Sequence, residues 1–260
     1  TSGGGLGFGM KWNMGWMNDT LRYLSEDPVN RRWHHGELTF SLVYAFSENY
    51  VLPLSHDEVV HGKGALVSKM PGDHWQQMAG LRSLFAYQWS HPGKQLIFMG
   101  QEFAQEQEWN ESYSLDWWLY DRPDHAGMAA LVARLNELYR SHSALWNDTY
   151  TGFEWIDASD GDHNLISYIR KSEATSGHRA QDELVCVVNF AGNPHEGYRI
   201  GLPHAGTWQE VVNTDDPQYG GSGVVNIGEL VAEEIPWNGR PYSIELRVPP
   251  LGALWLAPQH

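Results

Sequence analysis

The sequence predicts an α/β part, formed by about the last three strand–helix units of a (β/α)8 TIM barrel, followed by an antiparallel β-sandwich. Apolar strand-like runs alternate with helical patterns up to residue 148, and only short strand-like runs follow. Three parallel strands alone would leave an open edge and half a core, whereas a closed barrel needs eight units and roughly 250 residues. We therefore expect domains at residues 1–148 and 149–260, with the earlier barrel strands outside this chain.

The composition excludes several classes of protein. The chain has 260 residues, 42% of them hydrophobic, and a formal net charge of −15. Because there is no long basic run, we expect neither nucleic acid nor an anionic membrane surface as a partner. No stretch approaches the roughly 18 apolar residues of a membrane span. The 13 tryptophans suit either a large core or stacking on the faces of sugars.

The N-terminus and the single cysteine indicate the cellular compartment of the protein. The N-terminus at Thr1 has no signal-peptide layout and no starting Met, so we expect the chain to be part of a longer protein. Cys186 lies in an apolar run and cannot form a disulfide framework. A buried thiol in a reducing compartment fits this pattern, and we expect a cytoplasmic protein.

The first 54 residues contain two expected strands and one expected helix. Residues 6–12 are typical of a strand in which glycines allow close approach of another backbone or a ligand. Residues 18–32 are polar and are expected to be irregular. Apolar residues spaced along residues 37–46 indicate a helix. Tyr50–Leu54 is a short apolar run closed by a proline, and it predicts a buried parallel strand.

A second strand–helix pair follows. Asp73 is a plausible N-cap for a helix that ends at the Ser90-His-Pro-Gly93 turn. Residues 95–99 are the next expected strand. A loop at residues 104–121 carries three tryptophans, and a loop of this length in a compact domain is usually functional. Another helix is expected to start near Asp124, since apolar residues then recur at helical spacing.

The second half contains short β-rich runs. In the last of them, Ile244, Leu246 and Val248 alternate with charged residues, so one face is expected to be buried and the other wet. The expected strands lie at residues 164–170, 184–190, 207–213 and 243–248.

Metal binding is not expected from the sequence, and no cofactor is predicted. His34 and His35 have no third ligand at a suitable spacing. His56 and His61 resemble a helical zinc motif, but that motif places its histidines at i and i+4. At i and i+5 the two side chains would point about 140° apart on a helix.

His56 and Asp57 directly follow the expected strand Tyr50–Leu54. Loops after the strand ends of such barrels hold the chemistry. One interpretation is structural, with Asp57 capping the next segment and His56 as a rim histidine whose hydrogen bonds are satisfied. The other is glycoside chemistry, in which a neutral donor and a charged acceptor grip sugar hydroxyls in an oxocarbenium-like transition state.

The residues around this pair resemble a known family. Leu54-Ser-His-Asp-Glu-Val-Val-His-Gly-Lys63 is similar to the fourth signature region of the α-amylase superfamily, in the form found in bacterial 1,4-α-glucan branching enzymes. Further similar motifs span the chain. They are Gly7-Phe-Gly-Met-Lys-Trp-Asn-Met-Gly-Trp-Met-Asn-Asp19, Tyr44-Ala-Phe-Ser-Glu-Asn-Tyr-Val-Leu-Pro53, Pro92-Gly-Lys-Gln-Leu-Ile-Phe-Met-Gly-Gln-Glu-Phe-Ala104, Leu115-Asp-Trp117, Asn213-Thr-Asp215 and Tyr219-Gly-Gly-Ser-Gly223.

The resemblance implies a retaining transglycosylase that cuts an α-1,4-glucan and transfers the piece to a 6-hydroxyl, making α-1,6 branches in glycogen. It implies that Asp57 is the transition-state stabiliser and that His56 binds sugar hydroxyls. Trp12, Gln101 and Glu102 are candidates for lining the glucan groove, although packing or support roles fit each of them equally.

The chain also departs from the family. No segment resembles the signatures of the nucleophilic Asp or the acid/base Glu, which lie on earlier barrel strands. We therefore expect this chain alone to be inactive and to need the missing N-terminal part of the barrel as its partner. An α-glucan hydrolase of the same superfamily and a non-catalytic glucan-binding or structural fragment remain alternatives.

Overall fold

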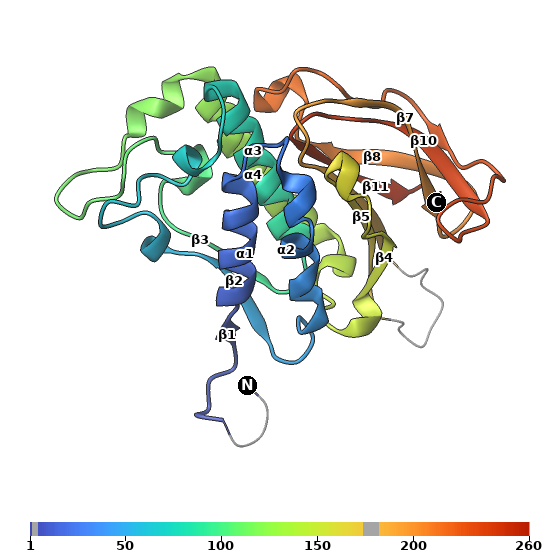
Figure 1. Ribbon diagram of the computed structural model, residues 1–260, viewed down its shortest axis with the longest axis horizontal. Helices are drawn as coiled ribbons and strands as arrows, with labels where there is room; N and C mark the ends of the chain where they lie inside the picture. The colour runs from blue at the N-terminus through green and yellow to red at the C-terminus, as the bar shows by residue number, and fades with distance from the viewer. Residues whose placement is uncertain (2–4, 174–181, 260) are drawn as a thin grey trace.

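The structure is a computed structural model that describes residues 1, 5–173 and 182–259. Its first half packs helices beside a small parallel sheet, and its second half is built from antiparallel sheets (Figure 1). The helices lie between the parallel sheet and the antiparallel part, so the two halves pack as successive layers (Figure 1).

The parallel sheet has the strand order β1-β2-β3. In its register Trp12 pairs with Val51, and Leu54 pairs with Ile97. Each strand is followed by at least one helix, which is the strand–helix alternation expected from the sequence. The strands are β1 (Lys11–Trp12), β2 (Tyr50–Leu54) and β3 (Lys94–Ile97), and the helices are α1 (Met14–Ser25), α2 (Gly36–Thr39), α3 (His74–Ser90) and α4 (Pro123–Ser141). Three such units are present, but they do not by themselves establish a closed barrel.

Local capping explains where α3 begins. The Asp73 side chain accepts from the Gln76 backbone N–H, and the Gln76 side chain accepts from the Asp73 N–H, which completes a capping box. The expected N-cap is therefore confirmed. The expected strand Tyr50–Leu54 is confirmed with the same bounds.

Three expectations for the first half are wrong in part. Residues 18–32 are not irregular throughout, because α1 runs to Ser25 and buries one face that includes Trp16 and Leu24. The expected helix at 37–46 is a four-residue helix followed by the 3-10 turn Phe40–Val43. The strand expected at 6–12 is reduced to Lys11–Trp12, which are the residues that pair in register with β2.

The second half contains two antiparallel sheets, as the sequence predicted. Four of its strands were not predicted. One of them is the central β11, whose alternation is obscured because its apolar residues form a continuous run. The larger sheet has the order β4-β5-β6-β11-β8-β9, and β10 pairs with β7. The strands are β4 (Phe153–Asp157), β5 (Leu165–Lys171), β6 (Glu183–Asn189), β7 (His195–Leu202), β8 (Thr207–Asn213), β9 (Leu230–Val231), β10 (Tyr242–Val248) and β11 (Gly252–Pro258).

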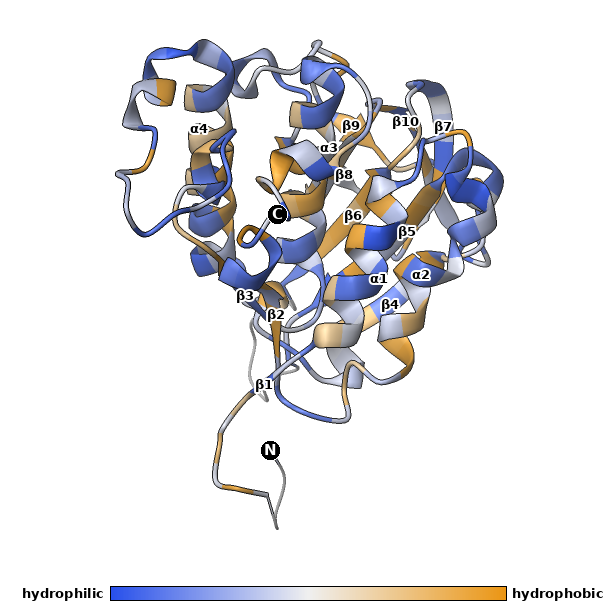
Figure 2. Ribbon diagram, turned by 60° about the vertical axis from the view of Figure 1, so that its left-hand side comes forward, coloured by the Kyte–Doolittle hydropathy of each residue, from blue (hydrophilic) through white to orange (hydrophobic). Residues whose placement is uncertain are grey.

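The central strands of the six-stranded sheet are buried on both faces. On β6, Val185 and Val187 belong to the core shared with β7 and β10, whereas Leu184, Cys186 and Val188 belong to the core shared with the helices. The apolar colour of β5 and β6 reflects this double burial (Figure 2). Burial raises the pKa of the Cys186 thiol to about 12, so the expectation of a core thiol is confirmed.

Buried arginines join the two halves. Arg31 donates to the Phe190 carbonyl at 2.7 Å, Arg82 donates to the Thr214 carbonyl at 2.9 Å, and Arg170 donates to the Ser90 carbonyl at 2.7 Å. Because these contacts cross residue 148, the halves share one continuous interior. The domain boundary at 148/149 remains a prediction.

Acid sensitivity is expected from His91, the residue after α3. It is 1% exposed, with Nδ1 2.8 Å from the Pro92 carbonyl and Nε2 3.0 Å from the Ser41 hydroxyl. Burial lowers the pKa of His91 to about 3. Below about pH 6.5 the unfolded chain therefore binds a proton that the folded protein does not, and stability falls as the pH decreases toward 3.

Between pH 7 and pH 5 this difference amounts to about 2 kcal/mol. We expect the free energy of unfolding of the wild type to fall by about that much more than that of His91→Asn over this interval. Denaturant titrations at the two pH values measure it. Equal pH dependence in both proteins would contradict the assignment.

Candidate functional site

His56 and Asp57 are presented by a capped turn at the carboxyl end of β2. Ser55 begins the 3-10 turn His56–Glu58, and the buried Glu58 carboxylate accepts from the Ser55 N–H at 2.5 Å and from the Ser55 hydroxyl at 2.9 Å. This capping box fixes the backbone on either side of the pair. The two side chains between the caps project outward, 53% and 54% exposed.

The pair is held as a unit next to β3. Nε2 of His56 lies 3.2 Å from Oδ1 of Asp57, and the His56 ring lies 5.9 Å from the ring of Phe98. Phe98 directly follows β3, so the imidazole spans the carboxyl ends of two neighbouring strands. An imidazole and a carboxylate in this position can present a donor and a charged acceptor to the same ligand.

The loop after β3 is bound to the loop after β2. Both Glu108 oxygens accept backbone N–H groups, from Gly62 at 3.0 Å and from Gly64 at 2.7 Å. These hydrogen bonds hold the pKa of the Glu108 carboxyl below its usual range. The backbone N–H of Trp109 donates to the Val59 carbonyl at 3.0 Å. The two loops therefore form one rim, and Glu108 supports its structure.

A pocket of about 450 Å³ lies at this rim. Its volume is in the range of small-molecule sites. The indole of Trp109 forms one wall of the pocket. It packs edge-to-face against the Phe98 ring, with the ring centroids 5.2 Å apart. The lining residues are His56, Val60, His61, Glu108, Trp109, Asn110 and Glu111.

Gln101 and Glu102 shape the backbone at the end of β3. The Gln101 side chain is 5% exposed, and its Oε1 accepts from the Phe98 N–H at 3.0 Å. The Glu102 carboxylate accepts from the Gly100 N–H at 2.8 Å, and Gly100 has a φ of 91° that favours glycine. Both side chains therefore make hydrogen bonds that support the backbone. They lie in the turn that follows Phe98 and the end of β3.

Trp12 lies at a different level of the parallel sheet. It ends β1 opposite Val51, which is three residues before the end of β2. At the usual rise of a strand this is roughly 10 Å before the end of β2. The indole is 42% exposed, so it is accessible but is placed lower in the sheet than His56 and Asp57.

Sequence reasoning found the pair at the end of β2 and the tryptophan-rich loop, but not their connection. Glu108 and His61 were missed as rim residues. Glu108 is 44 and 46 residues away from its backbone partners, and no periodic pattern reports such a contact. The loop at 104–121 also carries an exposed aromatic group, in which Trp117 and Tyr120 pack against Phe103.

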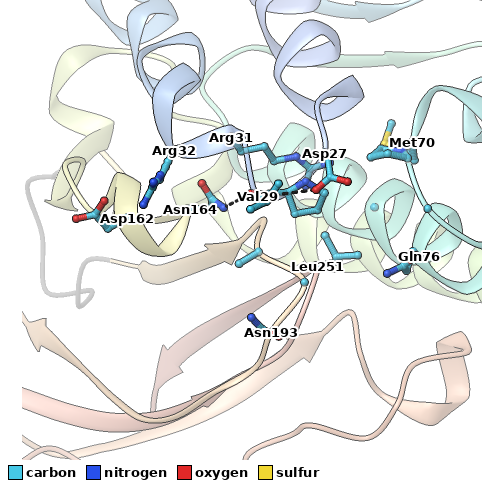
Figure 3. A pocket seen from close by; sticks show the side chains of 16 residues that line it. Asp27, Val29, Arg31, Arg32, Met70, Gln76, Asp162, Asn164, Asn193 and Leu251 are labelled. Carbon is cyan, nitrogen blue, oxygen red and sulfur yellow. Dashed lines mark hydrogen bonds between the residues drawn. The ribbon is translucent and has the colours of Figure 1, made fainter.

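A second pocket, of about 550 Å³, lies at the junction of the two halves (Figure 3). Its side chains come from the loop after α1, the start of α3 and the loops of the sandwich. Asn164 and Arg31 in its wall are structural, since Asn164 donates to the Pro28 carbonyl at 2.8 Å and Arg31 donates to the Leu24 carbonyl at 2.7 Å. This junction pocket is separate from the rim that carries Asp57.

Comparisons with known proteins bear on both halves of the chain. Residues 155–259 match the α-amylase C-terminal all-β domain. The antiparallel sheets described above are its structural counterpart.

Over nearly its whole length the chain is similar to bacterial 1,4-α-glucan branching enzymes named GlgB. It is 55% identical over 259 residues to the protein of Leifsonia xyli subsp. xyli, and this alignment covers 98% of this chain and 34% of that protein. It is 57% identical over 262 residues to the protein of Mycolicibacterium paratuberculosis, covering 100% of this chain and 35% of that protein. It is 57% identical over 259 residues to the protein of Thermobifida fusca, covering 98% and 34%.

These comparisons confirm the family resemblance drawn from the motifs. The chain spans about a third of the length of the curated relatives that it matches. In the part of the chain that the structure describes, no helix is long and apolar enough to cross a membrane.

Proposed function

We propose that the chain is part of a 1,4-α-glucan branching enzyme that acts on α-1,4-glucan and builds glycogen. The observation that carries this proposal is the capped turn after β2, which presents His56 and Asp57 together at the carboxyl end of a parallel strand. This is where a strand–helix barrel places its chemistry. The similarity over nearly the whole chain to proteins named as branching enzymes supports the same activity.

In the proposed reaction the bond between C1 and the 4-oxygen of the glucan breaks. An acid/base Glu protonates the departing 4-oxygen, which leaves as a hydroxyl, and a nucleophilic Asp bonds to C1. A 6-hydroxyl of a second glucan then attacks C1, returns its proton to the Glu carboxylate and releases the Asp. We place the nucleophile and the acid/base upstream of this chain, on the missing N-terminal part of the barrel.

Asp57 is assigned the stabilisation of the positive charge that develops at C1. Its half-exposed carboxylate faces outward, and its backbone carbonyl, which accepts from Lys63 at 2.6 Å, secures the turn without using that carboxylate. His56 is assigned to hydrogen-bond hydroxyls of the same sugar. Trp12, Gln101 and Glu102 are proposed to line the glucan groove, and for Gln101 and Glu102 this includes holding its backbone.

The proposal extends to architecture and location. Residues 1–148 would be the last three units of the (β/α)8 barrel, and residues 149–260 its C-terminal β-sandwich. The three-stranded parallel sheet with a helix after each strand supports the first assignment. We infer a cytoplasmic enzyme that requires no cofactor for this chemistry.

Incubation of the whole protein with amylose tests the function. We expect new α-1,6 linkages, counted as short chains after enzymatic debranching, with few new reducing ends. Release of reducing ends without branches would instead establish an α-glucan hydrolase of the same superfamily. Binding of amylose with neither product would support a non-catalytic glucan-binding role.

A further inference from the structure

A cluster of two histidines and two carboxylates joins the amino ends of α3 and α4 to the loop after β3. His74 is the first residue of α3, while Asp124 and His125 lie in the first turn of α4. Candidate ligand atoms of these three residues all lie within 4.8 Å of one another. Glu106, from the loop at 104–121, adds a fourth candidate ligand atom, an oxygen 3.2 Å from Nε2 of His125.

The buried His125 carries the argument. Its Nδ1 lies 2.8 Å from the Phe103 carbonyl oxygen, and its Nε2 lies 3.2 Å from Glu106 Oε1. Both of these oxygens only accept hydrogen bonds, whereas a neutral imidazole has only one N–H. When Nδ1 donates to the carbonyl, the Nε2 lone pair faces a carboxylate, and a cation between them removes this repulsion. A backbone carbonyl on Nδ1 is also the usual partner of a metal-binding histidine.

Distances and charge fit a divalent cation. Four ligands at about 2.0 Å from a tetrahedral zinc ion lie roughly 3.3 Å apart. Here Nε2 of His125 is 3.2 Å from Glu106 and 3.8 Å from Asp124, and Nε2 of His74 is 2.5 Å from Asp124. Glu106 lies 3.9 Å from the other ring nitrogen of His74, Nδ1, so its side chain has to rotate to complete the shell. The two carboxylates exceed the single charge of Arg122 by one, which leaves room for more positive charge.

We propose that His74, Asp124, His125 and Glu106 form a binding site for a zinc-class divalent metal ion, in which Arg122 is the counter-charge of the metal-free state. Arg122 now donates to Glu106 at 2.9 Å and to Asp124 at 3.2 Å, and its side chain is 38% exposed, so it can turn outward. The ion would fix the loop at 104–121 to both helices. The sequence predicted no metal because these residues are separated by up to 51 positions.

The competition between Arg122 and the metal provides a test. The whole protein, freed of metal by a chelator, is titrated with Zn²⁺ against a chromophoric chelator. Co²⁺ is added separately, and its visible absorption reports tetrahedral coordination. We expect one tight Zn²⁺ per chain. We also expect a loss of affinity of more than about 100-fold in His74→Ala, beyond what loss of an outer-shell partner causes.

Arg122→Gln separates this site from a purely ionic network. If the metal and the guanidinium compete, Zn²⁺ binds at least as tightly to this variant as to the wild type. Weaker binding would overturn the proposal. His34→Ala is the matched control, since the His34 side chain is 40% exposed and, among the described residues, pairs only with Glu37, at 3.4 Å. Equal affinity of the wild type and His74→Ala would also overturn the proposal, and because His74 is partly exposed its replacement leaves the fold intact.

Discussion

Replacing Asp57 with Asn in the whole protein is expected to lower the rate of branching by on the order of 10³-fold. Asn keeps the shape of the side chain but removes its charge, so it cannot offset the positive charge that develops at C1. The turn itself should persist, because Ser55 and Glu58 cap it and the Asp57 side chain takes no part in the capping box. Affinity for glucan should change by only a few fold, since most ground-state contacts remain.

The measurement is kcat for branching together with amylose affinity. Asp162→Asn is the control, because Asp162 lines the junction pocket rather than the rim. It should leave both quantities unchanged. A loss of less than about 10-fold in Asp57→Asn would show that this carboxylate does not stabilise the transition state.

Replacing Arg170 with Met is expected to destabilise the protein by about 3–5 kcal/mol. The guanidinium is fully buried and donates to the carbonyls of Gly152, Ser90 and Asn147 at 3.1, 2.7 and 2.8 Å. Met fills much of the volume but leaves three buried acceptors without donors. Since Ser90 ends α3 and Arg170 lies on β5, the loss falls on the contact between the two halves.

Arg22→Met provides the matched comparison. The Arg22 side chain is 58% exposed and pairs with Asp19 and Glu37 on the surface, so its loss should cost less than about 1 kcal/mol. Denaturant unfolding of both variants measures the difference. Equal effects would contradict the role of Arg170 in joining the helices to the sheet.

Sequence reasoning predicted best where local chemistry alone determines the structure. The apolar run of β2 and the capping box at Asp73 depend on neighbouring residues, and both were found at the right positions. The helix α1 was missed, because its exposed face is mainly polar and concealed the buried face that contains Trp16 and Leu24. The strand β11 was missed because both of its faces are buried and its apolar residues do not alternate.

The candidate site divides in the same way. His56 and Asp57 were predicted because they follow a strand in the sequence. The rim contact of Glu108 with Gly62 and Gly64, and the cluster around His125, were not predicted, because each joins segments that are many residues apart. The register of the sheet also lies outside sequence patterns, and it places Trp12 opposite Val51 rather than beside Asp57.

The most direct test compares branching by this 260-residue chain alone with branching by the whole protein on the same amylose. We predict new α-1,6 linkages only with the whole protein, because we propose that Asp57 acts with a nucleophile and an acid/base that lie upstream of this chain. Branches made by the chain alone would contradict this, and would mean that other carboxylates within these residues carry out the reaction.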